Sequence, residues 1–176
     1  MRDESTYRQR PRRRRAPRRV SGVGAVVLVG VAALGGCSSS PPGLVESADK
    51  KCDTITDRFR GDLAYGHDIG GDDVAKMRKR GALIRDLYTH VKGLPAPKSK
   101  AKRAELTTWL HKLDAYADEL YTMHNTFQNA KPGMDLLLAM IAADARIKSK
   151  EAGTAAKAFG FHSCADVKRW EYLPPD

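Results

Sequence analysis

Residues 99–128 of the chain read SKAKRAELTTWLHKLDAYADELYTMHNTFQ and carry its clearest helical pattern. Four apolar side chains recur in it every seven residues, and other apolar side chains fill the positions between them. A seven-residue repeat favours nearly antiparallel, left-handed packing of one helix against others. The stretch therefore predicts a long amphipathic helix with neighbours along its length. The repeating residues are Leu106, Leu113, Leu120 and Phe127, and those between them are Trp109, Leu110, Tyr116, Ala117 and Met123.

Three further stretches have the apolar spacing of amphipathic helices. The first covers about 46–65, the second starts at an N-cap at Asp72 and ends before Pro95, and the last covers about 134–159. Patterns typical of β-strands are nearly absent. Short loops between four long helices favour an up-down-up-down bundle. The last helix is expected to bury Met134, Leu137, Leu138, Ile141, Ala145, Ala152, Ala156 and Phe159.

A short C-terminal helix is expected after the fourth long one. Ser163 is followed three residues later by Asp166, which predicts a capping box for a helix ending near Trp170. The tail at 172–175 is expected to lie across the end of the bundle. The predicted fold class is therefore all-α, a four-helix bundle with a short C-terminal helix.

The chain begins with a segment of a different kind. Nine arginines precede an apolar run from Val20 to Leu34, and two glycines lead from it to Cys37. About 15 residues rise about 22 Å as a helix, less than the roughly 30 Å of a bilayer core. The positive segment, the short apolar run and the sequence LGGC at 34–37 resemble a bacterial lipoprotein signal with its lipobox.

The resemblance implies a location. In that family the lipobox cysteine is diacylated on its sulfur and becomes the first residue of the mature protein. Residues 1–36 would then be a cleaved signal peptide, 37–43 the lipidated Cys37 with a Ser/Pro tether, and 44–176 a helical domain anchored on the extracytoplasmic face of the cell membrane. The alternative is an uncleaved signal anchor with Cys37 as a bystander. Export through the general or the twin-arginine route stays open.

The net charge of +10 is concentrated at the start of the chain. Nine of the 31 basic and two of the 21 acidic residues precede Cys37, which leaves 22 and 19 and a charge of about +3 for the rest. A nucleic-acid binder needs a basic stripe on its folded domain, so nucleic acid is not an expected partner. The densest basic run, 76–80, is interpreted as a solvated helix face, with anionic lipid contact as the alternative.

Two cysteines remain in the expected domain. Cys52 lies on the apolar stripe of the first helix, and Cys164 follows the fourth helix. In an up-down-up-down bundle these positions lie at the same end, and an exported protein oxidises such a pair. We therefore expect a Cys52–Cys164 disulfide that closes the bundle. The alternative is a reactive Cys164, whose thiol pKa a helix N-terminus would lower.

The layout as a whole resembles small secreted lipoproteins of high-GC Gram-positive, actinobacterial type. The lipobox, the Ser/Pro tether, the all-helical domain and the phrase Phe-Gly-Phe-x-x-Cys at 159–164 carry this resemblance. It implies a location and a fold. It transfers no catalytic residues to this chain.

Patterns that carry chemistry are weak. None of the five histidines has a glutamate three residues before it, as di-iron bundles require, and no Gly-x-Ser-x-Gly elbow or phosphate-binding glycine loop is present. Asp86 and His90 are spaced for a surface hydrogen bond. The loop 66–73 carries one histidine and three aspartates, which turn and capping roles explain, with a cation site as the alternative.

His124 is the best candidate for a ligand residue. It lies near the apolar stripe of the long helix, and a haem between helices would need such a histidine or a methionine, from Met77, Met134 or Met140. The more ordinary interpretation is a packed, hydrogen-bonded histidine. The aromatic residues of this helix are interpreted as core, with an aromatic ligand groove as the alternative.

These observations favour a non-enzymatic binding or structural module of the cell envelope. Its expected partners are the membrane, through Cys37, and an envelope protein or cell-wall component, and no cofactor is predicted. The alternative is a carrier of an apolar ligand or haem within the bundle. A third possibility is an enzyme whose site is assembled across helices.

Overall fold

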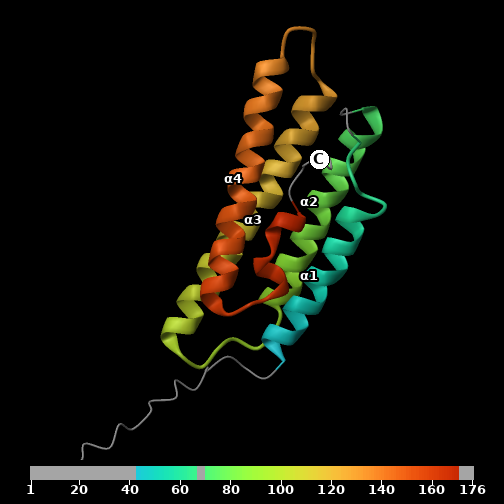
Figure 1. Cartoon of the computed structure of the whole chain (residues 1–176). Coiled ribbons are helices and arrows are strands. Elements are labelled where there is room, and N and C mark those ends of the chain that lie inside the picture. The colour runs from blue at the N-terminus through green and yellow to red at the C-terminus, as the bar shows by residue number, and fades with distance from the viewer. Residues whose placement is uncertain (1–42, 67–69, 171–176) are drawn as a thin grey trace, which may run out of the picture. The chain divides into compact units, whose positions relative to one another are not determined.

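The computed structural model describes residues 43–66 and 70–170. This part of the chain forms four antiparallel helices and two short 3-10 helices (Figure 1). The all-α, four-helix fold class is therefore confirmed, and no strand occurs within the described ranges. The elements are α1 (Leu44–Arg60), α2 (Gly71–Lys92), α3 (Lys100–Gln128), α4 (Asp135–Phe159), η1 (Ser163–Ala165) and η2 (Val167–Arg169).

Several predictions fall on residues that the structure does not describe. The signal peptide at 1–36, Cys37 and the tether up to residue 42 lie outside the described residues, as do 67–69 of the aspartate-rich loop and the tail at 172–175. Within the described ranges, none of the helices combines the length and apolarity that crossing a bilayer requires.

Local capping explains where the helices begin and end. The Ser99 side chain accepts a hydrogen bond from the Lys102 backbone N–H and so starts α3. The predicted N-cap at Asp72 is wrong: α2 begins after Gly70, whose N–H donates to the Asp73 carboxylate at 3.1 Å. α4 stops at Gly160, which has a left-handed φ of 109° that glycine adopts without steric cost.

The core is built around α3, as the seven-residue repeat predicts. Its inward face buries Trp109, Leu113 and Leu120 almost completely, whereas Phe127 at the end of the repeat is only half-buried. α1 contributes Ala48, Ile55 and Phe59 and α2 contributes Met77, Ile84 and Leu87 to the same buried cluster.

The C-terminal segment lies between α1 and α4 (Figure 1). The predicted short C-terminal helix is present as two successive 3-10 helices that end at Arg169, whereas the predicted capping box is wrong, since neither 3-10 helix has a side-chain cap of its own. Asp49 of α1 takes that role instead: its carboxylate accepts the N–H groups of His162 at 3.0 Å and Cys164 at 3.1 Å. The buried Trp170 then donates its indole N–H to Thr56 Oγ1 at 2.8 Å.

The expected disulfide is present. Cys52 of α1 and Cys164 of η1 are bonded, with their Cα atoms 5.1 Å apart, and both are fully buried. The bond joins residues 112 positions apart. It fixes the C-terminal segment against α1 at the same end of the bundle where Asp49 binds it.

The first half of α4 differs from the expectation. Leu137, predicted to be buried, is 43% exposed, because the hairpin of α3 and α4 extends past α1 and α2 there (Figure 1). Among the described residues, this part of α4 packs mainly against the second half of α3.

Candidate functional site

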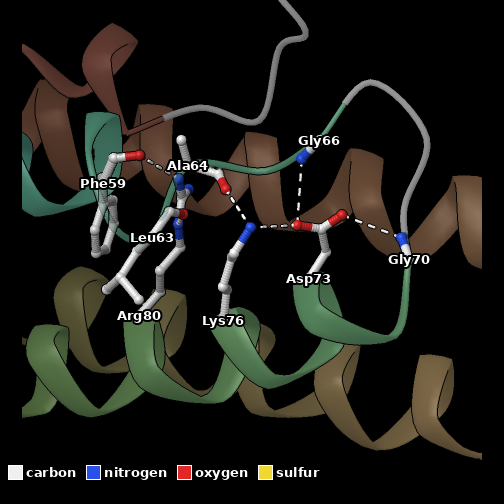
Figure 2. Close-up of polar contacts among 8 residues, drawn as sticks. All are labelled: Phe59, Leu63, Ala64, Gly66, Gly70, Asp73, Lys76 and Arg80. Carbon is white, nitrogen blue, oxygen red and sulfur yellow. Dashed lines mark hydrogen bonds and ion pairs between the residues drawn. The ribbon is translucent and has the colours of Figure 1, made fainter.

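Arg80 of α2 is a charged residue buried in the domain (Figure 2). The prediction of a solvated basic face is wrong for it, because its exposed fraction is 3%. Its guanidinium donates to the carbonyl oxygens of Phe59 at 2.7 Å, Leu63 at 3.0 Å and Trp170 at 3.3 Å. It also lies over the rings of Phe59 and Tyr65, 4.3 and 4.0 Å from their centroids.

These contacts give Arg80 a structural task. The carbonyls that it binds include that of Phe59 in the last turn of α1, where the helix dipole favours a positive charge. Burial lowers the pKa of its guanidinium, and the nearby Tyr65 and Tyr116 oppose that change. An arginine keeps its charge in proteins, so the buried cation holds α1, α2 and the C-terminal segment together.

A second network joins the start of α2 to the preceding loop (Figure 2). The Asp73 carboxylate accepts from the N–H groups of Gly66 and Gly70, and the Lys76 ammonium bridges it to the carbonyl oxygen of Ala64. Burial by itself raises the pKa of Asp73, but the hydrogen bonds from Lys76, Gly70 and Gly66 outweigh it and hold the pKa below its usual value. Turn and helix-start roles thus account for Asp73.

His124 lines an open hollow of about 320 Å³ between the first turns of α2 and the end of α3, together with Val74 and Phe127. Its Nδ1 donates to the Val74 carbonyl at 2.8 Å. In the neutral imidazole this leaves Nε2 as the acceptor.

The methionines considered with His124 do not join it in this hollow. Met77 is fully buried in the core, Met134 lies before the start of α4 and Met140 is 57% exposed. The enclosed cavity beside Arg80 has space for about 20 Å³, roughly one water. A haem does not fit that enclosed space.

The polar side chains between α1 and α2 pair differently from the prediction. His90 does not bond to Asp86; its Nε2 lies 2.9 Å from Ser47 Oγ, while Asp86 forms an ion pair with Lys51. Both contacts bridge α1 and α2 at the surface. Across the described part of the chain, no three His, Cys, Asp or Glu side chains gather to hold a metal ion.

The face of α4 turned away from the core is the main exposed apolar feature. We define the α4 outer face by side chains at spacings of four, three, four, seven and four residues, all of them exposed. Leu136 is 76% exposed, Met140 57% and Ile147 51%. The core-facing residues of the same helix, such as Ala145, Ala152 and Ala156, lie on the opposite side. The α4 outer face comprises Leu136, Met140, Ala143, Ile147, Thr154 and Ala158.

A groove runs beside the second half of this face. It has a volume of about 510 Å³ and lies between α3, with Thr108 and Lys112, and α4, with Thr154, Ala155 and Ala158. Lys112 and Glu151, which both line it, form an ion pair of 2.8 Å. Small side chains therefore form a hollow at one end of α4, and large exposed ones form a ridge at the other.

The described residues thus form a disulfide-closed helical bundle domain with an exposed apolar face on α4. Comparison with protein family models, with curated proteins and with solved structures finds no significant match for the chain. The proposals below therefore depend on its residues alone.

Proposed function

We propose that the protein is a lipoprotein anchored to the extracytoplasmic face of the cell membrane, of the small secreted type found in high-GC Gram-positive bacteria. Its helical domain is a non-enzymatic binding or structural module of the cell envelope. The observation that carries the proposal is a disulfide-closed domain whose first helix begins at Leu44, seven residues after the lipobox cysteine. Disulfides persist in oxidising compartments outside the cytoplasm.

The anchor is tested by Cys37→Ala in the full chain, with Ser38→Ala as the matched control. The wild type and the control are expected in the membrane fraction, accessible to added protease. Cys37→Ala is expected in the soluble extracytoplasmic fraction or as an unprocessed precursor. A Cys37→Ala chain that is still processed and membrane-bound, or a wild type retained in the cytoplasm, would refute the anchor.

The binding role is supported by the α4 outer face. Exposed apolar patches on a soluble domain mark sites of interaction with other molecules. Substituting Met140→Asp places a charge on this patch without touching the core, since Met140 is 57% exposed. We expect it to release any envelope partner that co-purifies with the detergent-extracted chain, whereas Asp57→Asn on α1 leaves it bound.

A second candidate function is a ligand carrier that uses the hollow at His124. It is favoured by the accepting Nε2 beside the apolar Val74 and Phe127. Titration of the full chain with haemin tests it: His124→Ala would lose the spectral shift of a bound haem and His111→Ala, an exposed residue, would keep it. Equal spectra for the three chains would reject this candidate.

A further inference from the structure

Four residues of the α4 outer face lie in two symmetric pairs about Ile147. Leu136 and Ala158 lie 11 residues before and after it, and Met140 and Thr154 lie seven before and after it. The members of each pair differ in size. The large ones are on the N-terminal half of the helix and the small ones, beside the groove, are on the C-terminal half.

We propose that a second copy of this chain covers the α4 outer face, in an antiparallel α4–α4 pair whose twofold axis passes through Ile147. In such a pair, Leu136 and Met140 of each copy lie over Ala158 and Thr154 of the other. The ridge of one chain enters the groove of the other, twice. One patch thus pairs with itself and leaves no open end, as a closed twofold interface requires.

The charges of α4 are complementary in the same arrangement. The N-terminal half carries Asp135, Asp144 and Arg146, a net charge of −1, and the C-terminal half carries Lys148, Lys150, Glu151 and Lys157, a net charge of +2. Asp144 and Lys150 lie three residues on either side of Ile147 and therefore face one another across the axis. Antiparallel pairing also places the partly positive N-terminal end of each α4 helix beside the partly negative C-terminal end of the other.

The acidic end gains a neutralising charge from this pairing. Glu119 of α3 lies near Asp144: burial raises the pKa of Glu119, the charge of Asp144 raises it further, and Lys148 of the same chain opposes this by lowering it. Lys150 of a second copy would lie beside these two carboxylates. None of these contacts requires the lipid anchor. The pairing rests on the binding role proposed above and identifies its partner as a second copy of the chain.

Single cysteines on the α4 outer face test the pairing in the full chain, in a Cys37→Ala background so that residue 37 carries no thiol. Ile147→Cys lies on the axis, so oxidation is expected to convert most of it to a covalent dimer. Leu136→Cys alone and Ala158→Cys alone stay monomeric, because the two copies of each are about 33 Å apart at 1.5 Å per residue. A mixture of the two variants is expected to crosslink.

Thr54→Cys, on the exposed face of α1, is the control for random collision. Crosslinking of Thr54→Cys or Leu136→Cys at the yield of Ile147→Cys would overturn the proposal, and so would an Ile147→Cys chain that stays monomeric. A dimer that needs the acylated Cys37, seen only when crosslinking is repeated with Cys37 intact, would mean that the lipid environment gathers the chains, and would also overturn it. If the anchor proposal is wrong, the cell fractionation of Cys37→Ala shows it. The crosslinking result does not depend on that outcome, because it is obtained without Cys37.

Discussion

At the scale of single residues, Arg80 joins parts of the chain that are distant in sequence. Its guanidinium binds carbonyl oxygens of Phe59, Leu63 and Trp170, the last of them 90 positions away. Trp170 also accepts from the Tyr116 hydroxyl at 3.4 Å. A buried cation of this kind is costly unless each donor finds an acceptor, and here backbone carbonyls supply three of them.

Arg80→Ala is therefore expected to destabilise the domain by about 3–5 kcal/mol, because it removes several buried hydrogen bonds from a charged donor, each of about 1.5–3 kcal/mol, and losses above about 5 kcal/mol are exceptional. It leaves three carbonyls without this donor and opens a void beside Phe59. Arg78→Ala, an exposed position two residues earlier on α2, is the control and should change stability by less than about 0.5 kcal/mol. Urea unfolding of both variants measures the difference, and equal losses would contradict the role given to Arg80.

Asp73 makes a contribution to the stability of the domain that is lost in acid. Its folded pKa lies below the unfolded value of about 3.9, so the ionised carboxylate stabilises the fold above roughly pH 4, and this is lost as the pH falls through the folded pKa. Glu119 has the opposite effect on the pH dependence of stability. Burial and then the charge of Asp144 raise its folded pKa, so its ionised form weakens the fold as the pH rises. The contribution of Asp73 is therefore measured by comparing the stability of Asp73→Asn with that of the wild type at each pH.

The expected outcome is that Asp73→Asn is less stable than the wild type at pH 7, by about 1–2 kcal/mol. The gap narrows as the pH falls from about 5 to about 2. Asp72→Asn, at an exposed neighbouring position, should track the wild type throughout. Denaturant unfolding at a series of pH values measures this, and a gap that does not change with pH would be inconsistent with it.

At the scale of elements, α4 meets the C-terminal segment at a close contact. A Cβ atom added at Gly153 would lie 2.5 Å from Val167 Cγ2 and 3.1 Å from the Ala165 carbonyl oxygen. Val167 is buried at 5% exposure and its branched side chain has little room to move. The glycine therefore lets η2 pack directly onto the helix.

Gly153→Ala is expected to destabilise the domain by about 1–3 kcal/mol through overpacking, despite the better helix propensity of alanine. Gly71→Ala has open space around its new Cβ and should be neutral or slightly stabilising. Combining Gly153→Ala with Val167→Ala should recover part of the loss. Thermal unfolding of the set measures these effects, and a neutral Gly153→Ala would mean that the segment is not held as described.

The sequence predicts the helices that are determined by interactions between residues close together in the chain. The apolar spacing from Ser99 to Gln128 places α3 within one residue of its observed start at Lys100, because such spacing depends on residues within a few turns of one another. The burial of Arg80 and the capping of η1 by Asp49 depend on residues far apart in the chain, so neither a basic run nor a capping pattern reveals them. The exposure of Leu137 has the same origin, since it depends on how far α1 and α2 extend. The spacing of Leu136, Met140 and Ile147 was a local signal for the α4 outer face, although the core stripe of α4 dominates the pattern.

At the scale of the whole molecule, the Cys52–Cys164 bond closes a loop of 112 positions. Such a loop loses much of its entropy in the unfolded chain, so the bond is expected to contribute roughly 4–5 kcal/mol. Cys52→Ser and Cys164→Ser should lose similar stability, and the double variant should lose about as much as either. Clearly unequal losses in denaturant unfolding would argue that one cysteine has a separate role.

We propose a lipid-anchored domain closed by one disulfide. The decisive measurement is the intact mass of the chain, extracted in detergent from the membranes of its native host and measured with and without reductant. We expect a chain that begins at Cys37, carries acyl groups and gains two hydrogen atoms on reduction. An unprocessed chain that begins before Cys37, or one with two free thiols at Cys52 and Cys164, would refute the proposal.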